Sequence, residues 1–445
     1  MRDIRSKKID RRKAILGTAA GLGVATSNAT WLSINTARAQ DTVKLQATVW
    51  LGDNEFQAIQ ELGAVHTESH PNVEIEFVNI VDGGPWGRDQ LQRMIAGGSA
   101  PDLMMMNTGQ FEAFGSSGAL MNLDELVESS GFDLSIYWPA AVDGCKIDGS
   151  VYGLPKDISN HIVYINTQFF EEAGVEVPDN DWTWDDYREI AKALTQDTDG
   201  DGQVDRWGTS ITNASWAWGG FVYSNGGEVL NADRTECLIN SEASTEALVQ
   251  YFAPITEDES AVPPGALPQM EGSSDQFQGG VIGMHMAGPW FRPSLVENEL
   301  FPWTARLFPR PVGGDAPTSI LYVDQWAMSA TTDHPEEAWN LLQFLGGPEG
   351  HNAWADIYGS RSINPIVEIA QSDQWLNYGG DEHRADNELI LEQLERTVAP
   401  LTNFGQGATV ENIWNDQFGL VIVGQLDVPT AVDLITDMVN AEVQS

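Results

Sequence analysis

The feature of this sequence that most constrains its fold is the alternation of short apolar segments with amphipathic ones. From Thr42 the chain runs VKLQATVW, EFQAIQELGAVHTESH and VEIEFVNI, a pattern that predicts strand, helix and strand. Later segments predict further strands at DLMMMN, HIVYIN and VIGMHMAG, and helices at RDQLQRMIAGG, FEEAGVEV, WTWDDYREIAKALTQ, EASTEALVQYFAPI and PEEAWNLLQFLGG. The alternation predicts an α/β fold with parallel or mixed sheets, and 445 residues suffice for two domains.

Residues 1–39 have the composition of an export signal. A basic leader precedes a short apolar core, and Ala37-Arg38-Ala39 provides a cleavage site. The pair Arg11-Arg12 ahead of a weakly hydrophobic core resembles a twin-arginine signal, with a Sec signal as the alternative. No later segment approaches 18 uninterrupted apolar residues, so we expect an exported, soluble protein in the periplasm or outside the cell.

The net charge of -42 is extreme for a chain of this length. Nucleic acids and anionic membrane surfaces would repel such a protein, which argues against both as partners. The self-repulsion is tolerable where salt shortens the Debye length, to roughly 3 Å at about 1 M. The composition therefore predicts a salty habitat.

The stretch DTDGDGQVDRWG presents Asp197, Asp199, Asp201 and Asp205 at the spacing of calcium ligands, with Gly202 at the turn. The twelfth position of an EF-hand loop is a Glu, whereas this chain has Gly208 there. A structural calcium site and a solvated acidic turn are both compatible with this pattern.

The sequence contains two cysteines, Cys145 and Cys237, which in an oxidising compartment either form a disulfide or remain two free thiols. The sequence has no CxxC, no HExxH and no Cys/His cluster among its 7 His. It therefore gives no support for zinc, and we expect no required cofactor.

Several phrases in a fixed order make the chain resemble the extracellular solute-binding proteins of ABC importers, family 1, the maltose and oligosaccharide type. They are Trp50 before Gly52-Asp53-Asn54, and then HPNVEIEF, AGGSAPDLMMMN, GALMNLDEL, DGSVYGLP, VYINTQFFEEAGVEVP, TWDDYREIAKALT, FQGGVIGMHMAGPW and HPEEAWNLLQFLGGPEG. The resemblance covers nearly the whole chain after the signal.

The resemblance implies the two-lobed periplasmic binding protein type II fold, each lobe a mixed sheet flanked by helices, with a hinge crossed several times. It places lobe one at 40–155 plus 328–370 and lobe two at 156–327 plus 371–445. It implies a monomer that binds a sugar or oligosaccharide between the lobes and delivers it to ABC permease subunits. It also places the aspartate-rich turn on the outside of lobe two.

The residues give an independent argument for a sugar, because 16 Trp is a high count for a chain with 9% aromatic residues. A pyranose packs its C–H face on an aromatic ring while its hydroxyls need fixed polar partners. We therefore predict ligand contacts from Trp and polar residues near the ends of strands, at Trp50, Asp53, Asn107, Gln110, Asp157, Asn160, Trp216, Trp218, Trp290, Asp324, Trp326, Arg361 and Trp414.

Each candidate also has a structural interpretation. The Trp residues could fill cores, and the polar residues could cap helices or form turns. Trp216 and Trp218 share a face if NASWAWGGF is extended. Trp290 is the strongest candidate, because Gly288-Pro289 breaks the preceding strand and the resemblance places a stacking aromatic there; it places another at Trp414.

Two other classes of protein remain as alternatives. An exported glycoside hydrolase also combines carboxylates with tryptophan platforms, although the sequence has no GxSxG or metal motif and the order of phrases favours a binding protein. A calcium-dependent adhesion module rests on residues 197–205 alone, and such modules usually show several repeats.

Overall fold

The computed structural model describes residues 42–80, 87–270, 272–314, 317–359, 361–399 and 406–444, apart from the side chain of Ala408. The predicted export signal lies outside the described residues. No helix in the described part of the chain is both long enough and apolar enough to cross a membrane.

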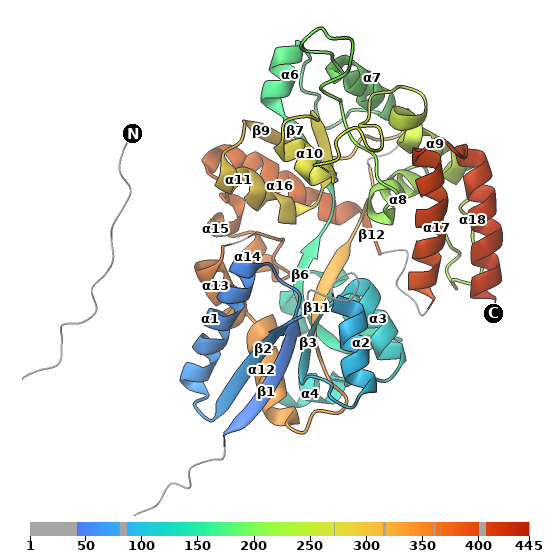
Figure 1. Ribbon diagram of the computed structural model, residues 1–445. Helices are drawn as coiled ribbons and strands as arrows, with labels where there is room; N and C mark the ends of the chain where they lie inside the picture. Colours follow the sequence, from blue (N-terminus) through green and yellow to red (C-terminus); the bar gives the residue numbers. More distant parts are fainter. Residues whose placement is uncertain are drawn as a thin grey trace, which may run out of the picture. The chain divides into compact units, whose positions relative to one another are not determined.

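A five-stranded mixed sheet forms the first half of the fold (Figure 1). Its strand order is β2-β1-β3-β11-β6; β1 is parallel to β2 and β3, and β11 is antiparallel to β3 and β6. The strands are β1 (Val43–Val49), β2 (Val73–Asn79), β3 (Leu103–Asn107), β6 (Gly153–Ser159) and β11 (Tyr322–Met328).

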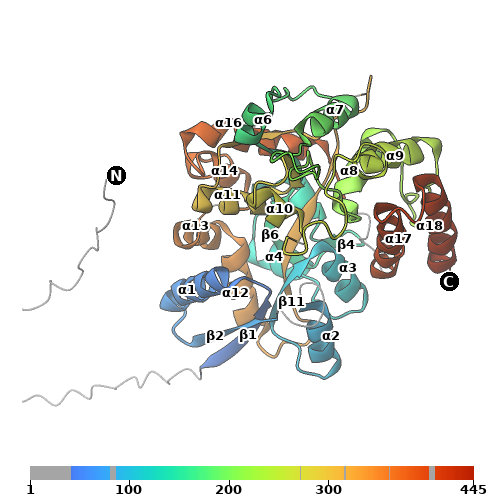
Figure 2. The ribbon, with the colours of Figure 1, turned by 45° about the horizontal axis from the view of Figure 1, so that its top comes forward.

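Both faces of this sheet are buried, because alternate side chains of β3 enter different cores. Leu103 and Met105 pack with α1 (Asp53–Ser69) and α12 (Pro335–Gly346), whereas Met104 and Met106 pack with α2 (Arg88–Ala96) and α3 (Thr108–Ser116). Figure 2 shows α1 and α12 on one side of the strands and α2 and α3 on the other. The continuous apolar run LMMM is the sequence signature of this two-sided burial.

The second half of the fold surrounds a smaller antiparallel sheet of order β8-β7-β9, made of β7 (Ile162–Asn166), β8 (Met284–Ala287) and β9 (Trp303–Arg306). Two short pairs complete the strands: β4 (Lys146–Ile147) with β5 (Ser150–Val151), and β10 (Ser319–Ile320) with β12 (Thr397–Val398). The remaining α-helices are α4 (Asp124–Ser130), α5 (Pro139–Asp143), α6 (Thr167–Ala173), α7 (Trp184–Leu194), α8 (Ser215–Ser224), α9 (Glu242–Thr256), α10 (Ser273–Gln278), α11 (Arg292–Asn298), α13 (Pro348–Ile357), α14 (Val367–Ala370), α15 (Asp373–Leu376), α16 (Arg384–Gln393), α17 (Gly407–Ile422) and α18 (Val428–Val443).

The chain passes between the two sheets at closely spaced points. Only Asn160 and His161 separate β6 from β7, and only Leu321 separates β10 from β11. A third segment runs beside them, where Ile363 forms an antiparallel bridge with Ile158. The expected lobe boundaries at 155/156 and 327/328 fall inside β6 and β11, both of which belong to the five-stranded sheet. The prediction of an α/β fold with sheets flanked by helices is confirmed; the larger sheet is mixed, as expected, whereas the smaller sheet contains antiparallel pairs throughout the described residues.

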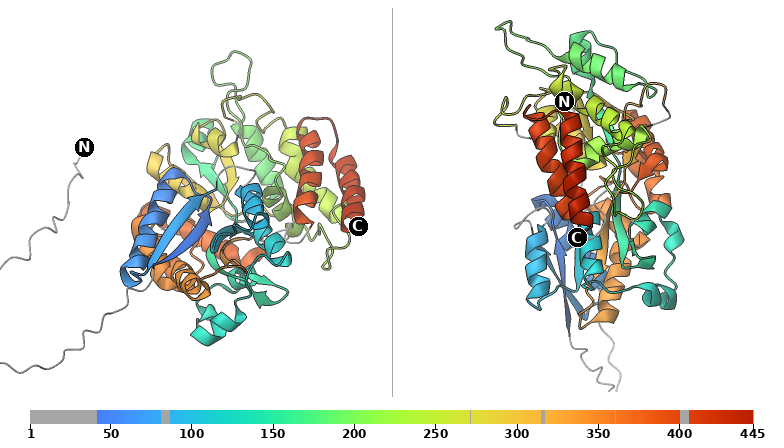
Figure 3. Two further views of the ribbon diagram at one scale, coloured as in Figure 1. Left: turned by 60° about the horizontal axis from the view of Figure 1, so that its bottom comes forward. Right: turned by 90° about the vertical axis from the view of Figure 1, so that its right-hand side faces the viewer.

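One local expectation is wrong. The segment NASWAWGGF is not extended, because Ser215–Ser224 forms α8. Trp218 therefore faces the core, fully buried, and meets Trp414 of α17 edge to face, with ring centroids 5.4 Å apart. In Figure 3 α17 and α18 run side by side at the C-terminal end of the chain. The apolar faces of these helices enclose the Trp218–Trp414 pair within one core cluster.

This packing generates a stability prediction for Trp414. The variant Trp414→Ala removes a fully buried indole, which we expect to lower the free energy of unfolding by about 3–5 kcal/mol. Urea denaturation followed by far-UV circular dichroism measures the loss. Trp290→Ala is the matched control, because Trp290 is 46% exposed and its removal is expected to cost about 1 kcal/mol or less. Equal losses in the two variants would contradict the core assignment.

Candidate functional site

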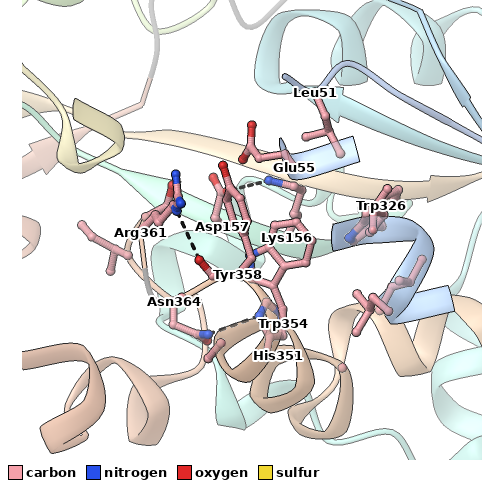
Figure 4. A pocket seen from close by; sticks show the side chains of 18 of the residues that line it. Leu51, Glu55, Lys156, Asp157, Trp326, His351, Trp354, Tyr358, Arg361 and Asn364 are labelled. Carbon is pink, nitrogen blue, oxygen red and sulfur yellow. Dashed lines mark hydrogen bonds and ion pairs between the residues drawn. The ribbon is translucent and has the colours of Figure 1, made fainter. Parts of the chain in front are cut away.

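A pocket lies against the end of the five-stranded sheet from which the chain leaves for the smaller sheet (Figure 4). Its walls come from the first turn of α1, from β6 and β11, and from α13 with the segment that follows it. The side chains that matter for its chemistry are Glu55, Lys156, Asp157, Trp326, His351 and Arg361.

The pairing of β6 with β11 explains why two consecutive charged residues reach this pocket. Asp324 is paired with Asp157 and Gln325 with Pro155, so Lys156 is an extra residue in the ladder, as in a β-bulge. Such a bulge re-aims side chains. Lys156 and Asp157 consequently both line the pocket, and Lys156 Nζ donates a hydrogen bond of 2.5 Å to Asp157 Oδ2.

Asp324 lies beside this ion pair and experiences its charges. Burial, followed by the negative charge of Asp157, raises the pKa of the Asp324 carboxyl well above its ordinary value. Burial alone would lower the pKa of Lys156, but the charges of Asp157, Asp324 and Glu55 raise it. The cluster therefore favours a protonated Asp324 next to a charged Lys156–Asp157 pair.

The cation at the opposite wall is Arg361. Its guanidinium lies over the ring of Tyr358, 3.7 Å from the centroid, and its Nε donates to the Tyr358 carbonyl oxygen at 3.2 Å. Its Nη2 donates to Glu297 Oε1 of α11 at 2.5 Å. Arg361 is thus held by an aromatic ring, a carbonyl group and a carboxylate at once.

An aromatic cluster lies at the crossing between the sheets. The His161 ring stacks on Trp216, with centroids 4.8 Å apart and an angle of 13° between the planes, and meets Trp290 edge to face at 5.1 Å. Tyr322 contacts the same imidazole edge to face at 5.9 Å. Because Tyr322, Asp324 and Trp326 alternate along β11, they share one face of the sheet, which places the aromatic cluster and the pocket along the same side of that strand.

Trp290 is positioned by a break in secondary structure. The strand β8 ends at Ala287, and the 3-10 turn η3 (Pro289–Phe291) follows after Gly288. Its neighbours Pro289 and Phe291 are buried, whereas Trp290 is 46% exposed. An indole that is held by a turn and partly exposed to solvent is suited to stacking on a ligand.

The structure brings several predicted residues together. Asn107, Asp324 and Asp157 lie opposite one another on β3, β11 and β6. Asp157, Trp326 and Arg361 line the pocket, and Trp216 and Trp290 join the aromatic cluster. Asp53 is exposed in the first turn of α1, and Trp50 packs against the core beneath that helix.

Other predicted residues have structural roles. Asn107 is also the N-cap of α3 and forms a capping box with Gln110, a buried residue. Asn160 is fully buried and donates from Nδ2 to the Ile390 carbonyl oxygen at 2.7 Å. Trp218 and Trp414 belong to a hydrophobic core, so we do not retain them as ligand contacts.

The two cysteines are free thiols in the structure. Both are buried, Cys145 in the core around β7 and α11 and Cys237 in the core of α8, α9 and α17. Burial raises the pKa of both thiols, which disfavours the reactive thiolate form. The disulfide alternative is therefore corrected in favour of two free thiols.

Of the four aspartates in the acidic turn, three come together. Carboxylate oxygens of Asp197, Asp199 and Asp205 lie within 4.8 Å of one another, whereas Asp201 is not part of the group. Asp197 also accepts hydrogen bonds from the backbone N–H groups of Gly200 and Gly202. This exposed acidic triad has the donor atoms and the spacing to bind a metal ion.

Sequence reasoning missed several pocket residues. Glu55 belongs to the first turn of α1, two residues after Asp53, and His351, Tyr358 and Asn364 come from α13 and the segment after it. The run YGSRSINP, polar and rich in turn residues directly after an amphipathic helix, was the available signal. It indicated Arg361 but not its neighbours.

Comparisons with known proteins agree on one family. The model of the bacterial extracellular solute-binding protein family matches residues 52–352. The lactose-binding protein of Rhizobium radiobacter is 24% identical over 313 residues, 67% of this chain and 69% of that protein. An ABC substrate-binding protein of Listeria monocytogenes, solved with cycloalternan, is 25% identical, with a TM-score of 0.79 over 90% of this chain and 99% of the other. A maltodextrin-binding domain of Bdellovibrio bacteriovorus, solved with maltotriose, has the same fold, with 18% identity and a TM-score of 0.73 over 91% of this chain and all of that chain.

The pocket histidine generates a prediction for pH. Burial lowers the pKa of His351 to about 4, so the folded state keeps the ring neutral while the unfolded chain takes up a proton below about pH 6.5. This contribution to stability is complete above that pH and is lost as the pH falls toward 4. We expect the unfolding free energy of the wild type to fall by about 2 kcal/mol more than that of His351→Asn between pH 7 and pH 5.

The variant is chosen to keep one contact. Asn364 Nδ2 donates to His351 Nδ1 at 3.2 Å, and an Asn side-chain oxygen can accept the same hydrogen bond without titrating. Urea denaturation at the two pH values provides the measurement. Parallel pH profiles for wild type and variant would show that His351 is not held neutral by the fold.

Proposed function

Because the chain belongs to the bacterial extracellular solute-binding protein family, we propose that it captures a sugar or oligosaccharide outside the cytoplasmic membrane and delivers it, as a monomer, to the permease of an ABC importer. Members of this family are non-catalytic binding components, so the ligand would leave chemically unchanged. The observation that carries the choice of a sugar is the exposed Trp290 together with a pocket whose lining combines two carboxylates, Glu55 and Asp157, with aromatic side chains.

The chemistry of this surface suits a carbohydrate. The faces of Trp216 and Trp290 offer π surfaces to the C–H face of a sugar ring. Asp157 and Asp324 on the same side of the strands offer oxygen atoms, and Arg361 offers N–H groups, for hydroxyl groups. Convergent polar groups beside aromatic faces are the usual composition of such sites. The cycloalternan and maltotriose of the two solved relatives are ligands of this chemical kind.

We propose that binding works by closure of two lobes about the crossings at β6–β7, β10–β11 and Ile363. One lobe would contain the five-stranded sheet, approximately 40–155 plus 328–370, and the other the smaller sheet, approximately 156–327 plus 371–445. A ligand that contacts both lobes stabilises the closed form, and a nearly complete switch requires a preference of about 5.5 kcal/mol for that form. Trp290 and Asp157 would contact the ligand from opposite sides.

Two further features of the proposal concern the export route and the habitat. Arg11-Arg12 would direct export through the twin-arginine route, and the net charge of -42 would suit a saline environment in which such self-repulsion is screened.

The first prediction of this proposal concerns Trp290. We expect the mature protein to gain thermal stability with at least one sugar from a panel of mono-, di- and trisaccharides, because a ligand that binds only the native state raises its stability by mass action. Trp290→Ala should weaken the binding of that sugar by about tenfold or more, measured by isothermal titration calorimetry, through loss of the stacking surface.

The control is Trp138→Ala, a variant at a partly buried tryptophan that is not among the residues lining the pocket and should leave the affinity within about twofold of wild type. Affinity within twofold of wild type in Trp290→Ala would show that the sugar binds elsewhere. Mass analysis of the bound sugar tests the hydrolase alternative, since cleavage during incubation would contradict a binding role.

We also propose that the acidic triad binds calcium in a structural role. Calcium should raise the midpoint of thermal unfolding of the wild type after treatment with a chelator, and the effect should be absent in the double variant Asp197→Asn/Asp205→Asn. Asp201→Asn is the matched control, because Asp201 lies outside the triad and should leave the calcium response intact. An equal response in all three proteins would place calcium elsewhere.

A further inference from the structure

Each cationic side chain of the pocket already has a carboxylate partner. Among the described residues that line it, Lys156 and Arg361 carry positive charge at neutral pH, since the pKa of His351 is lowered to about 4 by burial. Lys156 pairs with Asp157, and Arg361 with Glu297, both at 2.5 Å. Neither cation is therefore available to neutralise an anionic ligand without losing an existing contact.

Glu55 is different, because it lines the pocket and makes no hydrogen bond or ion pair within the described part of the chain. Figure 4 shows its carboxylate at the mouth of the pocket, near the Lys156–Asp157 pair. Burial is the main reason that the pKa values of Tyr358 and Asp324 are raised. The negative charge of Glu55 is one of the neighbouring charges that raise them further. The pocket therefore presents one carboxylate with its acceptor positions unused by protein groups.

We propose that Glu55 determines the charge class of the solute: the pocket accepts neutral polyols and polyols that carry an amine, and it rejects those that carry a carboxylate or a phosphate. This inference rests on the proposed function, since it describes the ligand of the same site.

The physical reason is the balance of charge around the bound molecule. A hydroxyl group or an ammonium group can donate to the Glu55 oxygens, and the bond to an ammonium is charge-assisted. An anionic group at the same place would meet the Glu55 carboxylate in a partly desolvated pocket, where repulsion is stronger than in water, and the charge of Lys156 is already balanced by Asp157. Arg361 offers N–H groups to the hydroxyl oxygens, so a neutral polyol finds both donors and acceptors.

The test uses sets of three sugars in which each charged member differs from the neutral one at a single carbon, C2 for the amine and C6 for the carboxylate: glucose, glucosamine and glucuronate; galactose, galactosamine and galacturonate; mannose, mannosamine and mannuronate. Isothermal titration calorimetry at pH 7 measures the affinity of wild type, Glu55→Gln and Glu61→Gln for each. Glu61 is an exposed acid on the same helix, so Glu61→Gln makes the same change of net charge away from the pocket. Circular dichroism confirms that both variants are folded.

In wild type we expect at least one neutral sugar to bind, its amino counterpart to bind as tightly or more tightly, and its uronate to bind about 100-fold more weakly. Glu55→Gln should reduce the ratio of amino-sugar to uronate affinity by about tenfold, whereas Glu61→Gln should leave it unchanged.

Equal binding of neutral sugar and uronate by wild type would overturn the inference and leave the proposed function intact. An equal effect of both substitutions would assign the selectivity to net charge and overturn the role of Glu55. Binding of no member by wild type would overturn this inference for monosaccharides, while the proposed function is tested separately by the panel that includes di- and trisaccharides.

Discussion

The antiparallel pairing of β6 with β11 is the interaction on which the rest of this structure depends. These two strands complete the five-stranded sheet, and each continues almost directly into the strands of the other half of the fold. The same pairing contains the bulge that turns both Lys156 and Asp157 toward the pocket and sets Asp324 beside them. A regular ladder would send one of two consecutive side chains to the opposite face.

The charged cluster at this bulge is costly to stability. Its side chains are mostly removed from water, 15% exposed for Lys156 and 19% for Asp157, and burial favours the neutral form of Asp324. When an ion pair is buried, the free energy lost by removing both charges from water often exceeds the free energy gained from their attraction, so apolar residues of similar size would often be as stable or more stable. A stability cost at the crossing between two sheets is consistent with the proposed role of these residues in ligand binding.

Much of the fold could be predicted from the sequence, because the signals were local. The run LMMM predicted a strand, and the order of apolar and amphipathic segments predicted an α/β fold with parallel or mixed sheets. The site was less predictable. The indole of Trp290 could be placed because a Gly-Pro pair precedes it, whereas Trp218 and Trp414 gave the same compositional signal and are core residues. Glu55 and Tyr358 join the pocket because the fold brings them close together, which no spacing in the sequence encodes. The segment that forms α8 contains Gly and aromatic residues, which also allowed an extended interpretation.

The two parts of the proposed site are also joined mechanically. Trp290 lies two residues before α11, and that helix contacts Arg361 twice: Arg292 donates to the Arg361 carbonyl oxygen at 2.9 Å, and Glu297 accepts from its guanidinium. Arg292 is itself fully buried, with its guanidinium 4.4 Å from the centroid of the Trp375 ring. The stacking residue and the cationic wall of the pocket are therefore fixed to one another through a single short helix. A ligand that displaces Trp290 would shift α11 and so strain its two hydrogen bonds to Arg361. A ligand that binds near Arg361 would in turn restrict the position of Trp290. Under the proposed function, Trp290 and Arg361 would therefore act as coupled rather than independent ligand contacts.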